Sequence, residues 1–309
     1  MPVIEVRHLR KTYGEHVAVA DVSFDVEEGE IVGILGSNGA GKTTTVECIE
    51  GLRSPDSGSI SVLGLDPQRD RAALRRVLGV QLQAGELPER LRVAEAVELF
   101  AAFYDDPADP GELIERWGLG AKRDTAFMNL SGGQRQRLSI VLALVGRPRV
   151  AILDELTTGL DPQARRDTWA AIEQIRDEGV SVLLVTHIME EAERLCDRVA
   201  VIDAGRVVAL DSPAGLVAGL AAGQRLRFRP SEPIEDEVLR ALPEVDALVR
   251  HGSTIEIAGR GELLTAVTSV LARHGVIATG LRVEQASLDD AVLALTARAP
   301  QTARAAQTV

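Results

Sequence analysis

The sequence predicts an α/β protein in which a parallel sheet carries a phosphate-binding loop and a smaller domain follows. Three apolar runs of strand length, at 31–35, 150–153 and 180–185, suit the buried strands of a parallel sheet. A helical pattern at about 162–178 separates the last two runs, as in a βαβ unit. The first run leads through a Gly-rich turn into a helical segment, which is the setting that a phosphate loop requires.

The other elements of the first domain follow from turn residues and apolar spacing. Partial alternation and a Glu-Glu-Gly turn indicate β structure over residues 3–35. Helical patterns dominate residues 88–146, and two short apolar runs around Ala204-Gly205 predict a hairpin at 199–209. Turn residues near 212–215 mark the expected end of this domain.

The remainder of the chain predicts a small α+β domain over residues 216–299, with a ferredoxin-like arrangement as one possibility. The candidate strands are 226–229, 254–257 and 276–278, and the candidate helices are 235–242 and 261–274. Residues 300–309 are rich in Ala, Thr and Gln, which predicts a disordered tail.

The composition excludes several classes of protein. The chain has 309 residues, enough for two domains, and 45% of them are hydrophobic. A net charge of −12 argues against a nucleic-acid-binding surface. No run approaches the ~20 apolar residues that cross a bilayer, and the N-terminus lacks the layout of a signal peptide. Cys48 and Cys196 are too few for a disulfide framework, so we expect a cytosolic chain.

The Gly-rich turn fits the pattern G-x-x-x-x-G-K-[ST]. Its residues are Gly36, Ser37, Asn38, Gly39, Ala40, Gly41, Lys42 and Thr43. Backbone N–H groups and the N-terminus of the next helix would face one phosphate there. Lys42 would then reach the terminal phosphates, and the Thr43 hydroxyl would ligate Mg²⁺. The alternative is an accidental Gly-rich turn, against which the flanking strand and helix argue.

Two acidic residues close the apolar run at 150–153. Asp154 and Glu155 would lie at the carboxyl end of a parallel strand, where ligands bind in open α/β sheets. Asp154 is placed to hold Mg²⁺ through water, and Glu155 to polarise an attacking water as a general base. Taken alone, the pair also fits a solvated acidic turn.

The run Leu130-Ser131-Gly132-Gly133-Gln134 precedes a second helical stretch. Ser131 as the N-cap, with two glycines after it, would leave backbone N–H groups uncovered as a second anion site. An ordinary helix cap is the alternative. If both helix N-termini bind one triphosphate, two subunits must face each other, because one chain cannot bring both to the same site.

Three single residues are weaker candidates. His187 follows the run at 180–185, where a neutral imidazole would hydrogen-bond the γ-phosphate, although a lone His is usually structural. The Gln83 amide would touch Mg²⁺ or the attacking water, or would be solvated. Tyr13 precedes a turn glycine and would stack on adenine, or pack as an ordinary aromatic residue.

Taken in order, these motifs resemble those of the ATP-binding subunits of ABC transporters. They match the A-loop, Walker A, Q-loop, LSGGQ signature, Walker B, D-loop and H-switch, at Tyr13, 36–43, Gln83, 130–134, 153–155, 159–161 and His187 respectively. The resemblance covers about residues 3–215. It implies a P-loop NTPase fold of the ABC ATPase cassette type, with a parallel core sheet, an antiparallel β subdomain and a helical subdomain at about 84–145.

The resemblance also implies an ATPase site that is shared by two copies of the chain. Two ATP molecules, with Mg²⁺, would lie in a head-to-tail homodimer between the Walker A loop of one copy and the signature of the other. The residues so implied to contact nucleotide also include Thr44, Gln134 and Asp161, of which Asp161 would signal across the interface. The implied catalytic set is Lys42, Gln83, Glu155 and His187, and the implied metal ligands are Thr43, Gln83 and Asp154.

A finer likeness concerns the segment 186–198 and the ending 287–296, which resemble the drug-resistance and ABC-2 export group of daunorubicin-type exporters. That likeness implies export of a drug-like, lipid or other small molecule through a separate integral membrane permease. The chain would then lie on the cytoplasmic face of the cell membrane and would bind no nucleic acid. Leu156, where the family usually has Pro, and Ile188, where a polar residue is more common, depart from the pattern.

Two alternatives to export remain at this stage. A soluble ABC ATPase acting on ribosomes or DNA would typically carry two cassettes, a coiled-coil insertion or zinc-binding cysteines, and this chain has none of them. An import system would require a solute-binding protein to partner the permease. The transported substrate is chosen by the permease, so no residue of this chain names it.

Overall fold

The computed structural model describes residues 2–81, 87–157, 159–219, 224–284 and 287–298. The chain divides into two compact units. One holds the residues up to Pro213 and the end of the last helix from Leu295, and the other is Ala214–Ala294. Gln83 and the predicted tail at 300–309 lie outside the described residues.

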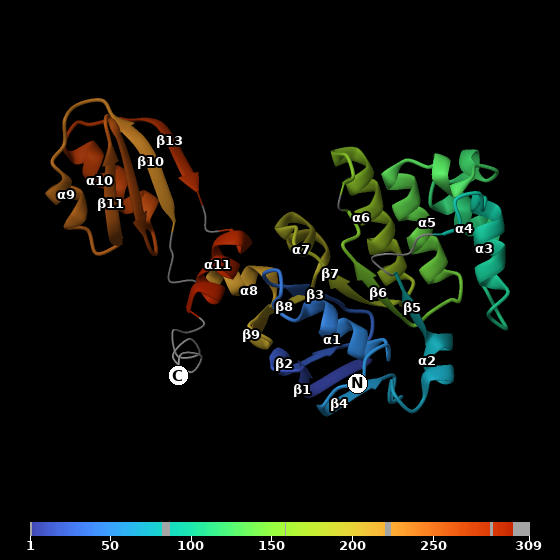
Figure 1. Ribbon diagram of the computed structural model, residues 1–309. Coiled ribbons are helices and arrows are strands. Elements are labelled where there is room, and N and C mark those ends of the chain that lie inside the picture. The colour runs from blue at the N-terminus through green and yellow to red at the C-terminus, as the bar shows by residue number, and fades with distance from the viewer. Residues whose placement is uncertain (1, 82–86, 158, 220–223, 285–286, 299–309) are drawn as a thin grey trace. The chain divides into compact units, whose positions relative to one another are not determined.

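The first unit is built on one sheet with the strand order β4-β1-β2-β9-β8-β3-β7-β6-β5 (Figure 1). Its strands are β1 (Ile4–Tyr13), β2 (His16–Val26), β3 (Ile31–Leu35), β4 (Ser57–Val62), β5 (Leu78–Val80), β6 (Val150–Asp154), β7 (Ser181–Val185), β8 (Arg198–Asp203) and β9 (Arg206–Asp211). Strand β3 pairs in parallel with β7 and β8, and β6 pairs in parallel with β5 and β7. The predicted parallel core is therefore confirmed.

Strands β1, β2 and β4 form the antiparallel part of the sheet, and β8 and β9 form the predicted hairpin. Every residue of β3 and β7 is buried, as expected of central strands covered on both faces. In β1, by contrast, buried and more exposed positions are mixed. The hydrophobic runs and the alternating runs of the sequence therefore correspond to the two parts of one mixed sheet.

The helices of this unit are α1 (Lys42–Ile49), α2 (Arg71–Val77), α3 (Val93–Ala101), α4 (Pro110–Arg116), α5 (Gly132–Leu144), α6 (Pro162–Asp177) and α7 (Met189–Leu195), with short 3₁₀ turns at Gly120–Lys122 and Phe127–Asn129. Helices α3, α4 and α5 contact one another and form the helical subdomain of the cassette. No helix in the described part of the chain is long and apolar enough to span a membrane.

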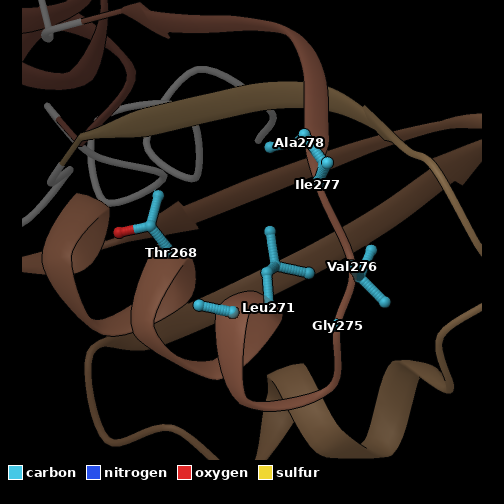
Figure 2. Close-up of a pocket in the computed structure, with 7 residues that line it drawn as sticks. Thr268, Leu271, Gly275, Val276, Ile277 and Ala278 are labelled. Carbon is cyan, nitrogen blue, oxygen red and sulfur yellow. The ribbon is translucent and has the colours of Figure 1, made fainter.

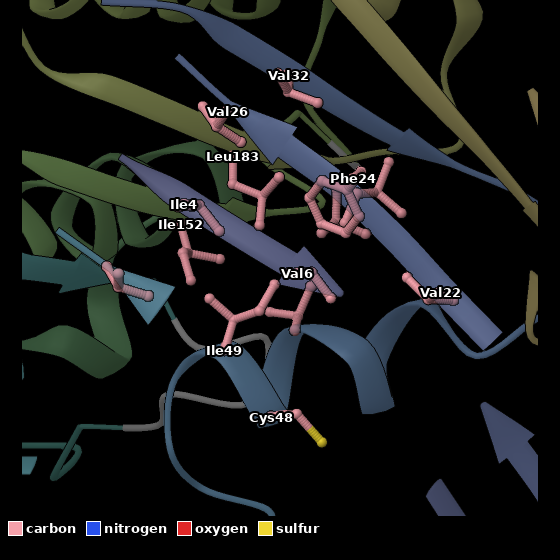
Figure 3. Close-up of a cluster of buried hydrophobic side chains, with 14 of the residues drawn as sticks. Ile4, Val6, Val22, Phe24, Val26, Val32, Cys48, Ile49, Ile152 and Leu183 are labelled. Carbon is pink, nitrogen blue, oxygen red and sulfur yellow. The ribbon is translucent and has the colours of Figure 1, made fainter. Parts of the chain in front are cut away.

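In the main core of this unit, α1 packs against both the antiparallel and the parallel part of the sheet. Figure 3 shows Ile49 of α1 beside Val6 of β1 and Ile152 of β6, and all three are fully buried. Burying a side chain of this size contributes about 1.5–3 kcal/mol. Because α1 follows directly from the Gly-rich turn, this core fixes the position of that turn relative to the strand ends.

The second unit contains a four-stranded antiparallel sheet with the order β11-β12-β10-β13. Its elements are β10 (Arg225–Pro230), α9 (Asp236–Arg240), β11 (Val245–His251), β12 (Thr254–Gly259), α10 (Leu263–Arg273) and β13 (Ala278–Glu284), flanked by α8 (Pro213–Ala218) and α11 (Leu288–Arg298). The βαββαβ order with this pairing is the ferredoxin-like arrangement, which the sequence had offered as one possibility.

Two details of this unit differ from the sequence expectation. Strand β11 was not predicted, because Leu248 is its one buried residue and no apolar alternation marks it. Val276 and Ile277, predicted as strand, precede β13 and form with the end of α10 the wall of a hollow of about 330 Å³ (Figure 2). A small core of its own, built around Leu226, Phe228 and Ile257, holds this unit together.

Candidate functional site

The Gly-rich turn lies between β3 and α1, and its glycines are required by the backbone. Gly36 and Gly41 have φ of 156° and 102°, and a Cβ at either position would collide with a backbone carbonyl, of Ile202 or of Ala18. Gly39 also has a positive φ, of 80°, with open space beside it. The turn therefore presents bare backbone, as the approach of a phosphate requires.

Lys42, the first residue of α1, folds its side chain back over the turn. Its Nζ donates hydrogen bonds to the carbonyl oxygens of Gly36, at 2.8 Å, and Ser37, at 3.0 Å. Burial lowers the pKa of Lys42, while the carboxylates of Glu155 and Asp154 act in the opposite direction. A half-buried ammonium beside the N-terminus of α1 makes the turn a site for an anion.

A hollow of about 330 Å³ opens at this turn. The predicted site residues that line it are Tyr13, Asn38, Gly39, Gly41, Lys42, Thr43, Thr44, Asp154 and Glu155. His16, which the sequence analysis did not single out, lines it as well, because β1 and β2 pair at Tyr13 and His16. The structure thus brings the predicted phosphate, metal, base and adenine residues to one place.

The two acidic residues occupy the end of β6 as predicted, but their environments differ. Burial raises the pKa of Asp154 to about 6, and the neighbouring Glu155 adds to the rise. Thr43 and Asp154 together offer the oxygen ligands that Mg²⁺ prefers. No group of three or more His, Cys, Asp or Glu suited to a metal exists among the described residues.

Glu155 has a left-handed backbone, with φ of 49°, which is uncommon for a residue other than glycine. Its N–H donates to the carbonyl of Val185 in β7 at 2.9 Å, so the residue is fixed against the neighbouring strand. His187, two residues beyond Val185, places its Nδ1 3.5 Å from Glu155 Oε1. A carboxylate and an imidazole thus face the same space at the ends of two adjacent strands.

The second predicted anion site lies at the start of α5. Ser131 Oγ accepts a hydrogen bond from the Gln134 N–H at 3.3 Å, and the Gln134 side chain accepts one from the Ser131 N–H at 3.0 Å. This capping box uses two of the free N–H groups. A Cβ added at Gly132 would meet open space, while a Cβ at Gly133 would lie 2.9 Å from Leu160. Ser131, Gly132 and Gln134 do not line the hollow at Lys42.

Asp161 caps the N-terminus of α6, where it accepts hydrogen bonds from the N–H groups of Gln163 and Ala164, each at 3.0 Å. These bonds lower the pKa of Asp161.

Two residues, Leu156 and Ile188, depart from the family pattern, and Leu156 is fully buried. The backbone N–H of Ile188 donates to Thr186 Oγ1 at 3.0 Å. The side chain of Thr186 makes this bond, so it forms without a polar side chain at position 188.

A buried hydrogen-bonded group that the sequence did not predict connects the segment after Glu155 with the helix after His187. Glu191 of α7 is fully buried, and its Oε1 accepts from Thr157 Oγ1 at 2.8 Å and from Trp169 Nε1 at 3.0 Å. Thr157 lies two residues after Glu155, and Glu191 lies four after His187. A Glu within an otherwise acidic helix start gave no signal of burial in the sequence.

Comparison with known proteins agrees with this geometry. The protein-family profile described as "ABC transporter" matches residues 19–158. A Nod factor export ATP-binding protein I of Burkholderia pseudomallei (strain K96243) is 38% identical over 305 residues, covering 96% of this chain and 97% of the relative. One from Ralstonia nicotianae is 41% identical over 224 residues, covering 70% and 69%.

Solved structures of ATP-binding cassettes share the fold of this chain. The ATP-binding subunit of an ABC transporter aligns with a TM-score of 0.65 at 31% identity, covering 70% of this chain and 92% of that chain. A dimeric ATP-binding cassette in a post-hydrolysis state, bound to ADP and Pi, aligns with a TM-score of 0.62 at 26% identity, covering 68% and 98%.

The fold and the Gly-rich turn define a P-loop ATPase. More particularly, the chain belongs to the ATP-binding subunits of ABC transporters, so it binds nucleotide, hydrolyses ATP and acts with a membrane permease. The relatives do not favour the alternative of a soluble ATPase acting on ribosomes or DNA.

Proposed function

We propose that this chain hydrolyses ATP to power the export of a drug-like, lipid or other small molecule through a separate ABC-2-type permease. The observation that carries the proposal is the single hollow in which the phosphate loop meets Asp154 and Glu155. The names of the relatives support the direction of transport, since they are export proteins.

In this proposal, Lys42 and the N–H groups of the turn hold the β- and γ-phosphates. Thr43 and Asp154 hold Mg²⁺, with Gln83 as a further contact, and the ion neutralises charge on the phosphates. Glu155 polarises the attacking water, and His187, 3.5 Å from it, orients that water and the γ-phosphate. Tyr13, at the edge of the hollow and 42% exposed, offers a face for adenine.

The proposed active form is a head-to-tail homodimer. Ser131 and Gly132 are exposed and stand at the N-terminus of a thirteen-residue helix, yet they do not line the hollow of their own chain. A second copy that presented them to the γ-phosphate would complete the site, with Gln134 and Asp161 at the same interface. Hydrolysis would then remove the bridge between the copies.

The proposed contact with the permease is a groove of about 650 Å³ between the sheet and the helical region. Glu50, Leu52, Phe100, Phe103 and Tyr104 are among the residues lining it. Leu52 and Phe103 expose 58% and 72% of their surface and line the same groove, and apolar surface gathered in one place marks an interaction site. We propose that a short cytosolic helix of the permease occupies this groove, which would place the chain on the cytoplasmic face of the membrane.

Purification of the tagged chain from detergent-solubilised membranes tests this function. We expect a polytopic membrane protein to co-purify and to stimulate the ATPase activity. The matched variant is Phe103→Asp, which changes the groove and not the nucleotide hollow, and which should recover less of the membrane protein. Recovery of ribosomes or DNA in place of a membrane protein would contradict the proposal, and recovery of a solute-binding protein would indicate import.

A further inference from the structure

The sheet of the second unit has one open face that carries a row of arginines. In β10, Leu226 and Phe228 are buried in the core of the unit, whereas Arg225, Arg227 and Arg229 are exposed between them. The helices α9 and α10 cover the buried face, because Leu239 and Val267 pack in that same core. Strand alternation therefore places the arginines together on the face that the two helices leave open.

An irregularity in β13 adds to this row. Ala278 and Leu281 both pack against the core, although residues three apart in a regular strand lie on opposite faces. The register between β10 and β13 shifts between Arg227 and Arg229, and Gly280 has a φ of 62°. The resulting bulge turns both Thr279 and Arg282 toward the open face, with Arg282 directly opposite Arg227.

These side chains surround a hollow of about 440 Å³. It is lined by Arg227, Arg229, Arg282, Thr254 and Thr279, together with Phe228 and Gly280. Arg229 Nε donates to Thr254 Oγ1 at 3.3 Å, and the Thr279 hydroxyl donates to the carbonyl of Arg229 at 2.8 Å. Side-chain and backbone contacts thus hold the wall of the hollow in place.

The arginines of the hollow lack the partners that other arginines of this unit have. Arg240 and Arg250 pair with Asp236, and Arg260 pairs with Asp246. Among the described side chains, no ion pair within 4.0 Å involves Arg227, Arg229 or Arg282, and Glu256, opposite Arg227 on β12, forms none either. Like charges directly opposite on adjacent strands are destabilising, so Arg227 and Arg282 together favour an anion between them.

We propose that this hollow binds a small anion that carries two or more phosphate groups. Guanidinium groups recognise phosphate through paired N–H donors, and the volume suits a small molecule. A single-stranded nucleic acid fits less well, because such sites stack bases on aromatic residues. Phe228 is the one aromatic residue beyond Trp169, and its side chain is buried.

Calorimetric titration of the full-length chain with inorganic pyrophosphate tests the site. The parent protein carries Lys42→Ala, which removes the ammonium of the phosphate loop, and the test variant adds Arg227→Ala and Arg282→Ala. Each arginine contributes a charged hydrogen bond, so the pair should weaken binding by about a hundredfold. The matched control adds Arg250→Ala and Arg260→Ala, two arginines of the same unit outside the hollow, and should bind like the parent.

A second arm distinguishes a free anion from a lipid headgroup. The same proteins are sedimented with vesicles that contain cardiolipin, whose headgroup carries two phosphates, or with vesicles of phosphatidylcholine alone. Binding to cardiolipin vesicles that the Arg227→Ala/Arg282→Ala variant loses would support the site with a membrane lipid as the source of the phosphates. Circular dichroism confirms folding, and the melting temperature of the variant should not fall, because two like charges have been removed.

Three results would overturn the proposal. The first is a parent protein that binds neither pyrophosphate nor anionic vesicles. The second is an arginine variant that binds both as tightly as the parent does. The third is a single-stranded oligonucleotide that binds through these arginines while pyrophosphate does not, which would make the surface a nucleic-acid site.

Discussion

Replacing the buried Glu191 by alanine should destabilise the nucleotide-binding unit and misplace its catalytic loops. The carboxylate accepts the Thr157 hydroxyl and the Trp169 indole N–H, and all three residues are buried. Removing it leaves two buried donors without an acceptor, at about 1–3 kcal/mol each. The expected loss is therefore about 2–6 kcal/mol, a large fraction of the roughly 5–15 kcal/mol by which a domain is stable.

The matched variant is Glu191→Gln, which keeps an acceptor for both donors. Its amide would replace Glu191 Oε2, which has no hydrogen-bond partner in the structure. The new amide nitrogen is then a buried donor without a partner. We therefore expect the free energy of unfolding to fall by about 1–3 kcal/mol, roughly half the loss expected for alanine. Thr157→Val and Trp169→Phe each remove one donor and should fall between the wild type and Glu191→Ala.

Urea unfolding followed by tryptophan fluorescence measures these differences. Trp117 and Trp169 are the two tryptophans of the chain and both lie in the first unit, so their emission reports that unit alone. ATP hydrolysis should fall about tenfold to a hundredfold in Glu191→Ala, because Glu155 and His187 lose a shared anchor. Equal unfolding midpoints for Glu191→Ala and wild type would refute the reasoning.

The remaining predictions concern the phosphate loop, the half-buried acid Glu50 and the permease groove. Lys42→Ala should abolish ATP binding in a titration with a fluorescent ATP analogue, and retained affinity would count against the phosphate-loop assignment. Burial raises the pKa of Glu50 from 4.5 to about 8, so its contribution to stability is full below pH 4.5 and is lost as the pH rises through 8. Glu50→Gln should therefore be more stable than wild type above pH 8, on the order of a few kcal/mol by urea unfolding, and an unchanged pH profile would argue against a protonated Glu50. Phe103→Asp should reduce the permease recovered on co-purification by about tenfold, and undiminished recovery would exclude this groove as the contact.

Local sequence patterns were sufficient to predict most of the strands and helices of the first unit. The apolar runs of β3, β6 and β7 are buried on both faces, and a Gly-rich turn after β3 has few conformations open to it, so strand, loop and helix follow from the residues themselves. The placement of Asp154 at the end of β6 beside Lys42 follows as well, because parallel strands present their carboxyl ends at one edge.

Features that depend on distant contacts were not predictable. Strand β11 is held by its pairing with β12 and has little hydrophobic pattern of its own. Glu191 resembles its solvated neighbours in sequence, and its burial depends on Trp169 from another helix. The strand bearing Arg227 was predicted, yet its position opposite Arg282 depends on a bulge in β13.

The most direct test of the central claim is the molar mass of Glu155→Gln with ATP, measured by light scattering after size exclusion. A site completed by a second copy predicts a shift from one copy to two when ATP is added. Adding Ser131→Arg to this variant should block the shift while ATP binding persists. A Glu155→Gln protein that stays a single copy with ATP bound, or dimers that tolerate Ser131→Arg, would contradict the shared site.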